Sequence, residues 1–382
     1  MSGNDSVQVH KIHGPATLGA LTGLVDGNRF RVALSNFETQ YVFWAPDEML
    51  PLGEPQSAVL NGTVGNDWAY QFDTHAIMQG SLNGAAYFNE VIGFARGTSF
   101  YGSGGDDSLI SSPNATPLPP MHLSINATTR VSSLTRGNLA SPGFVSSNNF
   151  SEFESLYAYA NAFGQPMTTC SYVGTAGSDT FYGLPDTSIL SSQGIFYQTI
   201  GYDSVEADLG GGVDTAVLYA SADADVLEAS PDVTTLIRVP AFRRNIVRNA
   251  ESVYAFATAG GNDRASISDQ TSSGAGNDVL FATSEYSLLY RPGSYLIQAI
   301  GFANVEVTSS TGYDTAIILD RPGGNQLTAM SDGVEMNYYG KSRVTIKAFD
   351  IVYANGLYGG VNRKVTTATP LFPIVYAGTW IG

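Results

Sequence analysis

The chain has 382 residues, 43% apolar and only 14% charged, a composition that excludes a disordered protein and can supply a large core. The 34 acidic and 18 basic residues give a net charge of −16, which disfavours nucleic acid as a partner and favours multivalent cations. The single cysteine, Cys170, excludes an internal disulfide and is expected to be a small buried hydrophobe. We find no secretory leader and no run of about 18 apolar residues, so we expect no membrane span.

An aromatic residue that leads a short apolar strand recurs along the chain. It stands at Phe37, Phe88, Phe153, Tyr202, Phe302 and Phe349, with Ala250 in place of the ring in one copy. The spacing predicts a repeat of about 50 residues. The longest interval, between Phe88 and Phe153, contains the Pro- and Ser-rich stretch 111–120, which predicts a loop insertion near 111–148. The third residue after the aromatic is usually apolar, as in Val205, Val253 and Val305, and stacking is expected to bring these residues into one internal ladder.

A Gly-x-Asp turn is the second landmark of the repeat. It occurs at Gly3–Asp5, Gly65–Asp67, Gly105–Asp107, Gly177–Asp179, Gly212–Asp214, Gly261–Asp263 and Gly312–Asp314, with a further copy at Gly276–Asp278. Apolar residues follow at alternate positions, for example Ala216 and Leu218, and this period of two predicts a strand after the turn.

Strands at this spacing fit two all-β architectures. We favour a parallel β-helix, or β-solenoid, of about seven repeats, because stacked coils tolerate a loop insertion at a corner. The alternative is a closed seven-bladed β-propeller, in which the half-repeats at the two ends of the chain would complete one blade. The predicted organisation is a single solenoid over residues 1–365 followed by a tail or cap over 366–382.

Parts of the sequence resemble two known repeat families. The segments 250–267, 302–318 and 349–354 resemble the tandem Gly-x-Asp repeats of very long secreted surface proteins from planctomycete-type bacteria, and this resemblance implies a β-solenoid of unestablished activity. Residues 273–281 are similar to one hemolysin-type (RTX) calcium-binding nonapeptide. That family needs consecutive nine-residue copies that share calcium ions, whereas Asp263 and Asp278 are fifteen positions apart here.

Each turn aspartate has two interpretations. Its carboxylate caps backbone amides of its own turn, which needs no ion, or stacked carboxylates provide the oxygen ligands that calcium prefers. The candidate calcium ligands are Asp67, Asp107, Asp179, Asp214, Asp263, Asp278 and Asp314. Asp263 and Asp278 are the first choices among them.

The sequence predicts no catalytic residues and no organic cofactor. We expect an extracellular or cell-surface structural or adhesive protein that associates end to end, because the turn half at Gly3–Asp5 complements the aromatic-led half at 349–354. A polysaccharide or a cell surface is a further expected partner. The alternative is a calcium-dependent polysaccharide lyase or epimerase, for which Arg238, Arg243, Arg244 and Arg248 would supply the basic residue.

Overall fold

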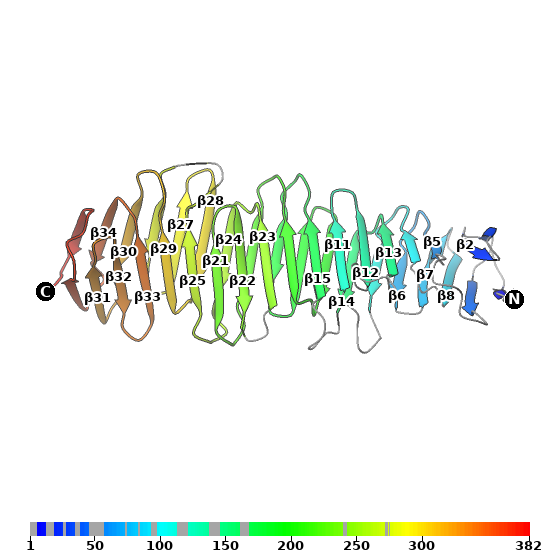
Figure 1. Cartoon of the computed structure of the whole chain (residues 1–382), viewed down its shortest axis with the longest axis horizontal. Helices are drawn as coiled ribbons and strands as arrows, with labels where there is room; N and C mark the ends of the chain where they lie inside the picture. The colour runs from blue at the N-terminus through cyan, green and yellow to red at the C-terminus, as the bar shows by residue number, and fades with distance from the viewer. Residues whose placement is uncertain are drawn as a thin grey trace. The chain divides into compact units, whose positions relative to one another are not determined.

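The structure is a computed structural model that describes residues 6–12, 19–25, 28–34, 39–45, 57–72, 75–82, 85–92, 98–112, 121–136, 146–160, 168–239, 243–271, 274 and 276–382. Every regular element in these residues is a β-strand, and strands of successive coils stack in parallel (Figure 1). The predicted β-solenoid is therefore confirmed, and the chain does not form the closed propeller.

The chain divides into two compact units, and in each the strands form two sheets, which we call sheet A and sheet B. The first unit comprises Met1–Gly174 and Asp186–Val205. Its sheet A contains β1 (Ser6–Ile12), β4 (Thr39–Ala45), β6 (Trp68–Gln71), β7 (His75–Leu82), β8 (Ala85–Ile92), β10 (Ser108–Ser111), β14 (Ser155–Tyr159), β17 (Thr187–Ser192) and β18 (Ile195–Ile200). Its sheet B contains β2 (Gly19–Val25), β3 (Asn28–Leu34), β5 (Ser57–Asn61), β9 (Thr98–Tyr101), β11 (Met121–Asn126), β12 (Val131–Arg136), β13 (Ser146–Ser151) and β15 (Thr168–Val173).

The second unit comprises Thr175–Pro185 and Glu206–Gly382, and the division between the units falls within β19 (Ser204–Asp208) of sheet B. Its sheet A contains β16 (Thr180–Gly183), β20 (Thr215–Tyr219), β24 (Ser252–Phe256), β26 (Val279–Ala282), β27 (Tyr286–Arg291), β28 (Tyr295–Ile300), β30 (Thr315–Leu319), β34 (Ile351–Gly356) and β36 (Ile374–Gly378). Its sheet B contains β21 (Asp225–Ala229), β22 (Val233–Arg238), β23 (Arg243–Arg248), β25 (Arg264–Ser268), β29 (Asn304–Thr308), β31 (Gly324–Ala329), β32 (Gly333–Tyr338), β33 (Ser342–Lys347) and β35 (Val361–Thr366).

Each of the four sequence repeats in residues 153–348 corresponds to five strands. In residues 250–300 the chain forms β24 in sheet A, β25 in sheet B, and then β26, β27 and β28 in sheet A. The last three strands form an antiparallel meander, while β24 pairs in parallel with β20 and β28. The next meander, β31 to β33, lies in sheet B. Meanders therefore alternate between the sheets, and two sequence repeats make one full structural period.

This alternation overturns one detail of the sequence analysis. Val253 and Val352 lie in sheet A, whereas Val305 lies in sheet B. The predicted single ladder of these apolar residues is wrong, because successive copies of the aromatic-led strand belong to opposite sheets. Phe302 and Phe349 are nevertheless buried, so the aromatic positions do contribute to the core.

The core lies between the two sheets, and buried residues alternate with partly exposed ones along each strand. In β24 Val253 and Ala255 are buried, and in β30 Ala316 and Ile318 are buried, while the residues between them are partly exposed. Residues that face one another across strands are often of unequal size, such as Ala216 opposite Val253. This pairing fills the space between stacked coils at the density that protein interiors need.

The other predictions about the organisation of the chain fall partly inside and partly outside the described residues. The predicted insertion near 111–148 contains β11 and β12, and 113–120 and 137–145 lie outside the described residues. The predicted tail, 366–382, contributes β36, which pairs with β34. Phe37 and Gly3–Asp5 lie outside the described residues, and Phe88 lies inside β8. Across the described ranges, no helix has the length and apolar character that crossing a bilayer requires.

Candidate functional site

All seven candidate aspartates are buried at corners where the chain passes from one sheet to the other. Asp263 lies between β24 and β25, where the chain enters sheet B. The other six lie directly before strands of sheet A: Asp67, Asp107, Asp179, Asp214, Asp278 and Asp314. The recurring Gly-x-Asp motif therefore marks the corners of the solenoid.

Most of these carboxylates accept hydrogen bonds from the backbone N–H groups of two coils. Within its own turn, Asp179 accepts from the backbone N–H of Thr175, with 2.7 Å from N to Oδ2. In the stack, the N–H of Asp179 donates to Oδ1 of Asp214 over 2.8 Å, and the N–H of Asp214 donates to Oε2 of Glu251 over 2.7 Å. Each carboxylate thus bonds the coil before it, as the turn-cap interpretation requires.

We call such a series a carboxylate ladder, and three of them lead into sheet A. In the first unit the ladder is Asp67, Asp107 and Glu154, and in the second unit the ladders are Asp179, Asp214 and Glu251, and Asp278, Asp314 and Asp350. Asp225 and Asp263 make one such step at the entry to sheet B. The structure therefore distributes the predicted calcium ligands along separate ladders and does not gather them at one point.

The middle carboxylates of two ladders each have an oxygen without a partner. Among the described residues, Oδ2 of Asp107 and Oδ2 of Asp214 are buried and accept no hydrogen bond. The turn of Asp214 has glycine, Gly210, at the place where the turn of Asp179 has Thr175. Burial raises the pKa of Asp107 to about 7, and the carboxylates of Asp67 and Glu154 add to the shift. Burial likewise raises the pKa of Asp214 to about 6, with Asp179 and Glu251 adding to it.

These raised pKa values predict that stability falls as the pH rises. Between about pH 4 and pH 7 the folded protein keeps a proton on Asp107 that the unfolded chain releases, so this contribution is complete below the unfolded pKa and is lost through about pH 7. We expect the free energy of unfolding to decrease by about 2 kcal/mol from pH 5 to pH 8 through this residue.

Urea denaturation at a series of pH values tests this expectation. The variant Asp107→Asn should flatten the dependence, because an amide does not titrate. Asp223→Asn removes a formal charge at an exposed turn of the second unit and should keep the wild-type slope. Equal slopes in Asp107→Asn and the wild type would show that Asp107 titrates as an ordinary carboxyl.

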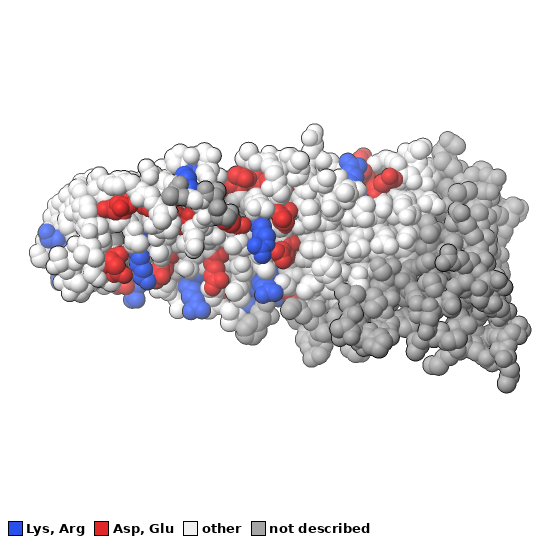
Figure 2. Space-filling model, turned by 45° about the horizontal axis from the view of Figure 1, so that its top comes forward, with Lys and Arg blue, Asp and Glu red and all other residues white. Residues whose placement is uncertain are grey.

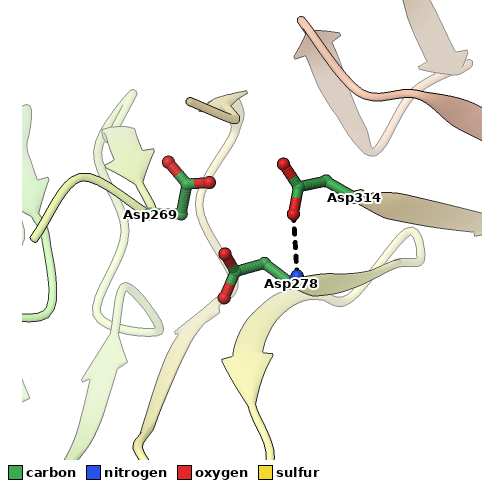
Figure 3. Close-up of side chains that lie close together, drawn as sticks. All are labelled: Asp269, Asp278 and Asp314. Atoms are coloured by element: carbon green, nitrogen blue, oxygen red, sulfur yellow. Dashed lines mark hydrogen bonds between the residues drawn. The ribbon is translucent and has the colours of Figure 1, made fainter. Parts of the chain in front are cut away.

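Three carboxylates of the second unit do converge at one place. Asp278 and Asp314, from adjacent steps of one ladder, meet Asp269, which directly follows β25, and ligand atoms of the three lie within 4.8 Å of one another (Figure 3). Asp269 accepts from the N–H of Ser310 at 2.9 Å, and the Ser309 hydroxyl bonds Asp314. Burial raises the pKa of Asp314, and the charges of Asp269 and Asp278 add to the shift.

The cluster already contains a cation, the guanidinium of Arg291. Arg291 donates from Nε to Oδ1 of Asp278 at 3.0 Å and from Nη2 to Oδ2 at 2.8 Å, and the Tyr295 hydroxyl donates to the same Oδ1 at 2.7 Å. In contrast, Oδ1 of Asp269 is buried and has no hydrogen-bond partner among the described residues. A hard cation such as calcium would therefore be held by Asp269 and Asp314 with the least loss of existing bonds.

A melting experiment tests whether this cluster takes calcium. At matched ionic strength, we expect calcium to raise the melting temperature relative to a chelator, because an ion that binds only the folded state stabilises it. Asp269→Asn should remove the difference, whereas Asp332→Asn, at an exposed turn of the same unit, should retain it. If calcium and chelator gave the same melting temperature for the wild type, the aspartates would act as turn caps alone.

The arginines of the alternative enzymatic interpretation are divided between the interior and the surface: Arg238 and Arg243 are buried, whereas Arg244 and Arg248 are exposed. Arg238 is 4% exposed and donates to the carbonyl oxygens of Gly183 and Tyr219 and to Oδ1 of Asn245. Arg243 is also buried, and Arg248 pairs with Glu206. Tyr338 ends β32 as Arg238 ends β22, and its hydroxyl likewise bonds backbone carbonyls, those of Ala282 and Leu319. Arg238 is thus a brace between coils.

A shallow groove with mixed charge lies on the outer face of sheet B in the second unit. Its lining includes Glu228, Arg264, Glu306, Glu335 and Arg343. Acidic and basic side chains are also interspersed on the face of the C-terminal part of the chain shown in Figure 2. Some charges of the groove are paired. Nζ of Lys347 lies 2.8 Å from Oε2 of Glu306, and Nε of Arg343 lies 3.7 Å from Oε1 of Glu335.

The sequence analysis missed four acidic residues that complete these arrangements. Glu154, Glu251 and Asp350 end the ladders, and each directly follows an aromatic-led position, so their shared place in the repeat was a usable signal. Asp269 belongs to no Gly-x-Asp turn, and only the fold brings it to Asp314.

Neither a scan against protein-family models nor a search of curated proteins finds a match for this chain, so its resemblance to the planctomycete-type and RTX repeats stays a prediction.

Proposed function

We propose that this chain is a structural or adhesive β-solenoid of the extracellular space or the cell surface that associates end to end with further copies, and that it is not an enzyme. The observation that carries the proposal is that, among the described residues, β36 of sheet A pairs along one edge alone. The residues of the repeat support it, because the ladder carboxylates and the brace Arg238 bond the solenoid's own backbone. Calcium, if held by Asp269 and Asp314, would serve the stability of this scaffold.

Within the part of the chain that the structure describes, β36 pairs with a strand on one side and with none on the other. It pairs in parallel with β34, with the N–H of Val352 donating to Pro373 O at 3.1 Å and the N–H of Thr379 donating to Gly356 O at 3.3 Å. In a parallel ladder the amides alternate, so those of Ile374, Tyr376 and Gly378 point away from β34. No strand among the described residues pairs with them.

Apolar side chains surround this edge. Leu371 is 88% exposed, Val375 on β36 is 42% exposed, and Val361 on β35 is 53% exposed. The outer side of β35 is partly covered, because Ile381 pairs with Arg363 and its carbonyl accepts from the N–H of Lys364 at 2.9 Å. Unpaired strand edges with exposed apolar side chains are templates for a further strand, and head-to-tail addition that does not close produces a filament.

Sedimentation velocity and electron microscopy over a concentration series test the proposal. We expect linear assemblies of the wild type, and we expect the double variant Val361→Lys/Leu371→Lys to lose them, because lysines at a strand edge prevent pairing. The matched control, Val213→Lys/Tyr313→Lys, adds the same charge at two exposed corner positions of the same unit and should assemble normally.

Two results would contradict the proposal. The first is a monomeric wild type at every concentration, or an edge variant that assembles as well as the wild type. The second is turnover: incubation with uronate polymers that yields unsaturated products, and that is lost in the variant Arg244→Ala, would favour the lyase or epimerase interpretation.

A further inference from the structure

The outer face of sheet A in the second unit has no charged side chains on the strands named here. Its strands β16, β20, β24, β26, β27, β28, β30 and β34 alternate buried and partly exposed positions. No outward position of these strands carries Asp, Glu, Lys or Arg, and Arg291, at the end of β27, is held by Asp278. A chain with a net charge of −16 therefore leaves one broad face uncharged.

The side chains on this face are mainly aromatic and branched aliphatic. Its central row contains Val217, Tyr254, Leu288, Phe281, Ile317 and Tyr353, in register across the strands. Beside this row, the rings of Tyr219 and Phe256 stack with centroids 5.1 Å apart, and those of Phe281 and Tyr290 stack at 6.3 Å. Tyr219 and Tyr353 are 37% and 38% exposed, so the rings are accessible to a partner.

Sheet B of the same unit has a different outer face. There Glu228, Arg264, Glu306 and Arg343 occupy outward positions of β21, β25, β29 and β33. The two faces belong to the same coils and meet the same solvent, so the fold itself does not require the difference. A sheet face in contact with water is usually polar, and a contiguous apolar face on a folded protein marks an interaction surface.

We propose that this charge-free face of sheet A is an interface to a second copy of the chain, packed sheet on sheet. The eight strands each offer two or three outward positions, which is comparable with the about 20–30 residues that each partner contributes to a stable interface. Depletion of charge and enrichment in Tyr and Phe are typical of the core of such interfaces. Two copies that meet on this face bring no like charges together, and the contact is isologous.

The composition of the face favours a second copy over other occupants. Branched side chains such as Val217 and Ile317 interdigitate well between two packed sheets. An anionic membrane surface would require basic residues, which the face lacks. A polysaccharide would require more hydrogen-bonding groups than the central row offers between Val217 and Tyr353, where Tyr254, Gln298 and Tyr353 carry them. The proposal is independent of the end-to-end association, since it uses different residues.

Sedimentation equilibrium with three variants tests this interface. The double variant Tyr254→Lys/Ile317→Lys places two charges in the central row, and we expect it to raise the dissociation constant of the pair at least tenfold. Gln298→Lys, which replaces an already polar side chain, should weaken the pair in the same direction and guards against a folding defect. The control Thr235→Lys/Thr345→Lys adds the same charge to the outer face of sheet B and should leave the constant within twofold.

The outcomes separate the two modes of association. The edge variant Val361→Lys/Leu371→Lys should lose linear assemblies and keep the lateral pair, whereas the face variant should do the opposite. A wild type without lateral pairs, or equal pairing in the folded face variant, would overturn the proposal. Co-sedimentation of a monomeric wild type with an insoluble neutral polysaccharide, lost in the face variant, would also overturn it and assign the face to a glycan.

Discussion

Replacement of Arg291 by methionine should lower the free energy of unfolding by about 3–5 kcal/mol, because it leaves a buried carboxylate without its counter-ion. Asp278 is fully buried at its side chain, and Arg291 contacts both of its oxygens. Without the guanidinium, Asp278 would face the charges of Asp269 and Asp314 across the cluster in Figure 3. Methionine keeps most of the volume and flexibility of the arginine stem, so the loss isolates the charge.

Lys341→Met is the matched control. Lys341 pairs with Glu285 at 2.9 Å, but their side chains are 44% and 62% exposed. Exposed ion pairs contribute between about 0 and 1 kcal/mol, so this variant should unfold close to the wild-type urea concentration. If Arg291→Met and Lys341→Met lowered the free energy of unfolding by similar amounts, the ion pair with Arg291 would not be what stabilises the buried Asp278.

Gly212→Ala should lower the free energy of unfolding by about 2–4 kcal/mol, since two penalties add at this position. Gly212 has a φ of +143°, in the region that favours glycine. A Cβ there would lie 2.4 Å from the carbonyl oxygen of Gly177 on the neighbouring coil, and neither backbone can retreat without breaking the ladder that joins Asp179 to Asp214. The glycine of the Gly-x-Asp motif thus permits one corner to stack on the next.

The neighbouring residue provides a control within the same turn. Gly211 has no positive φ, and a Cβ at this position would meet no heavy atom within 4 Å. Gly211→Ala should therefore change the free energy of unfolding by no more than about 0.5 kcal/mol, with a small gain from the stiffer unfolded chain. Thermal or urea unfolding of the two variants side by side decides the matter. An equally tolerated alanine at both positions would show that the corners do not stack closely.

Much of the solenoid could be predicted from local chemistry. Period-two apolar patterns such as Ala216 and Leu218 fixed the strand after a Gly-x-Asp turn, and the glycine and aspartate of that turn placed the corners. The buried aromatic at Phe302 followed from its place ahead of an apolar strand. These signals are local because a turn needs a residue that tolerates positive φ and a side chain that can cap amides.

The candidate site was less accessible to the sequence. The motif found Asp278 and Asp314, but it could not show that a ladder bond joins them or that Arg291, thirteen positions beyond Asp278, neutralises the pair. Asp269 carries no motif and reaches the cluster only because β25 ends beside the corner before β26. Carboxylates on separate coils become neighbours through stacking, which depends on contacts distant in sequence.

By itself, the sequence determined the all-β class, the repeat and the positions of the corners, because each depends on the conformational preferences of a few adjacent residues. Only the tertiary structure decided which sheet each copy joins and which side of each strand faces outward. In Thr215–Tyr219 and Thr315–Leu319 apolar residues occupy both alternations, so either side could face the core. Stacking against neighbouring coils buries Ala216 and Ala316 and leaves Val217 and Ile317 on the uncharged outer face, since the small side chains fit the interior opposite larger ones.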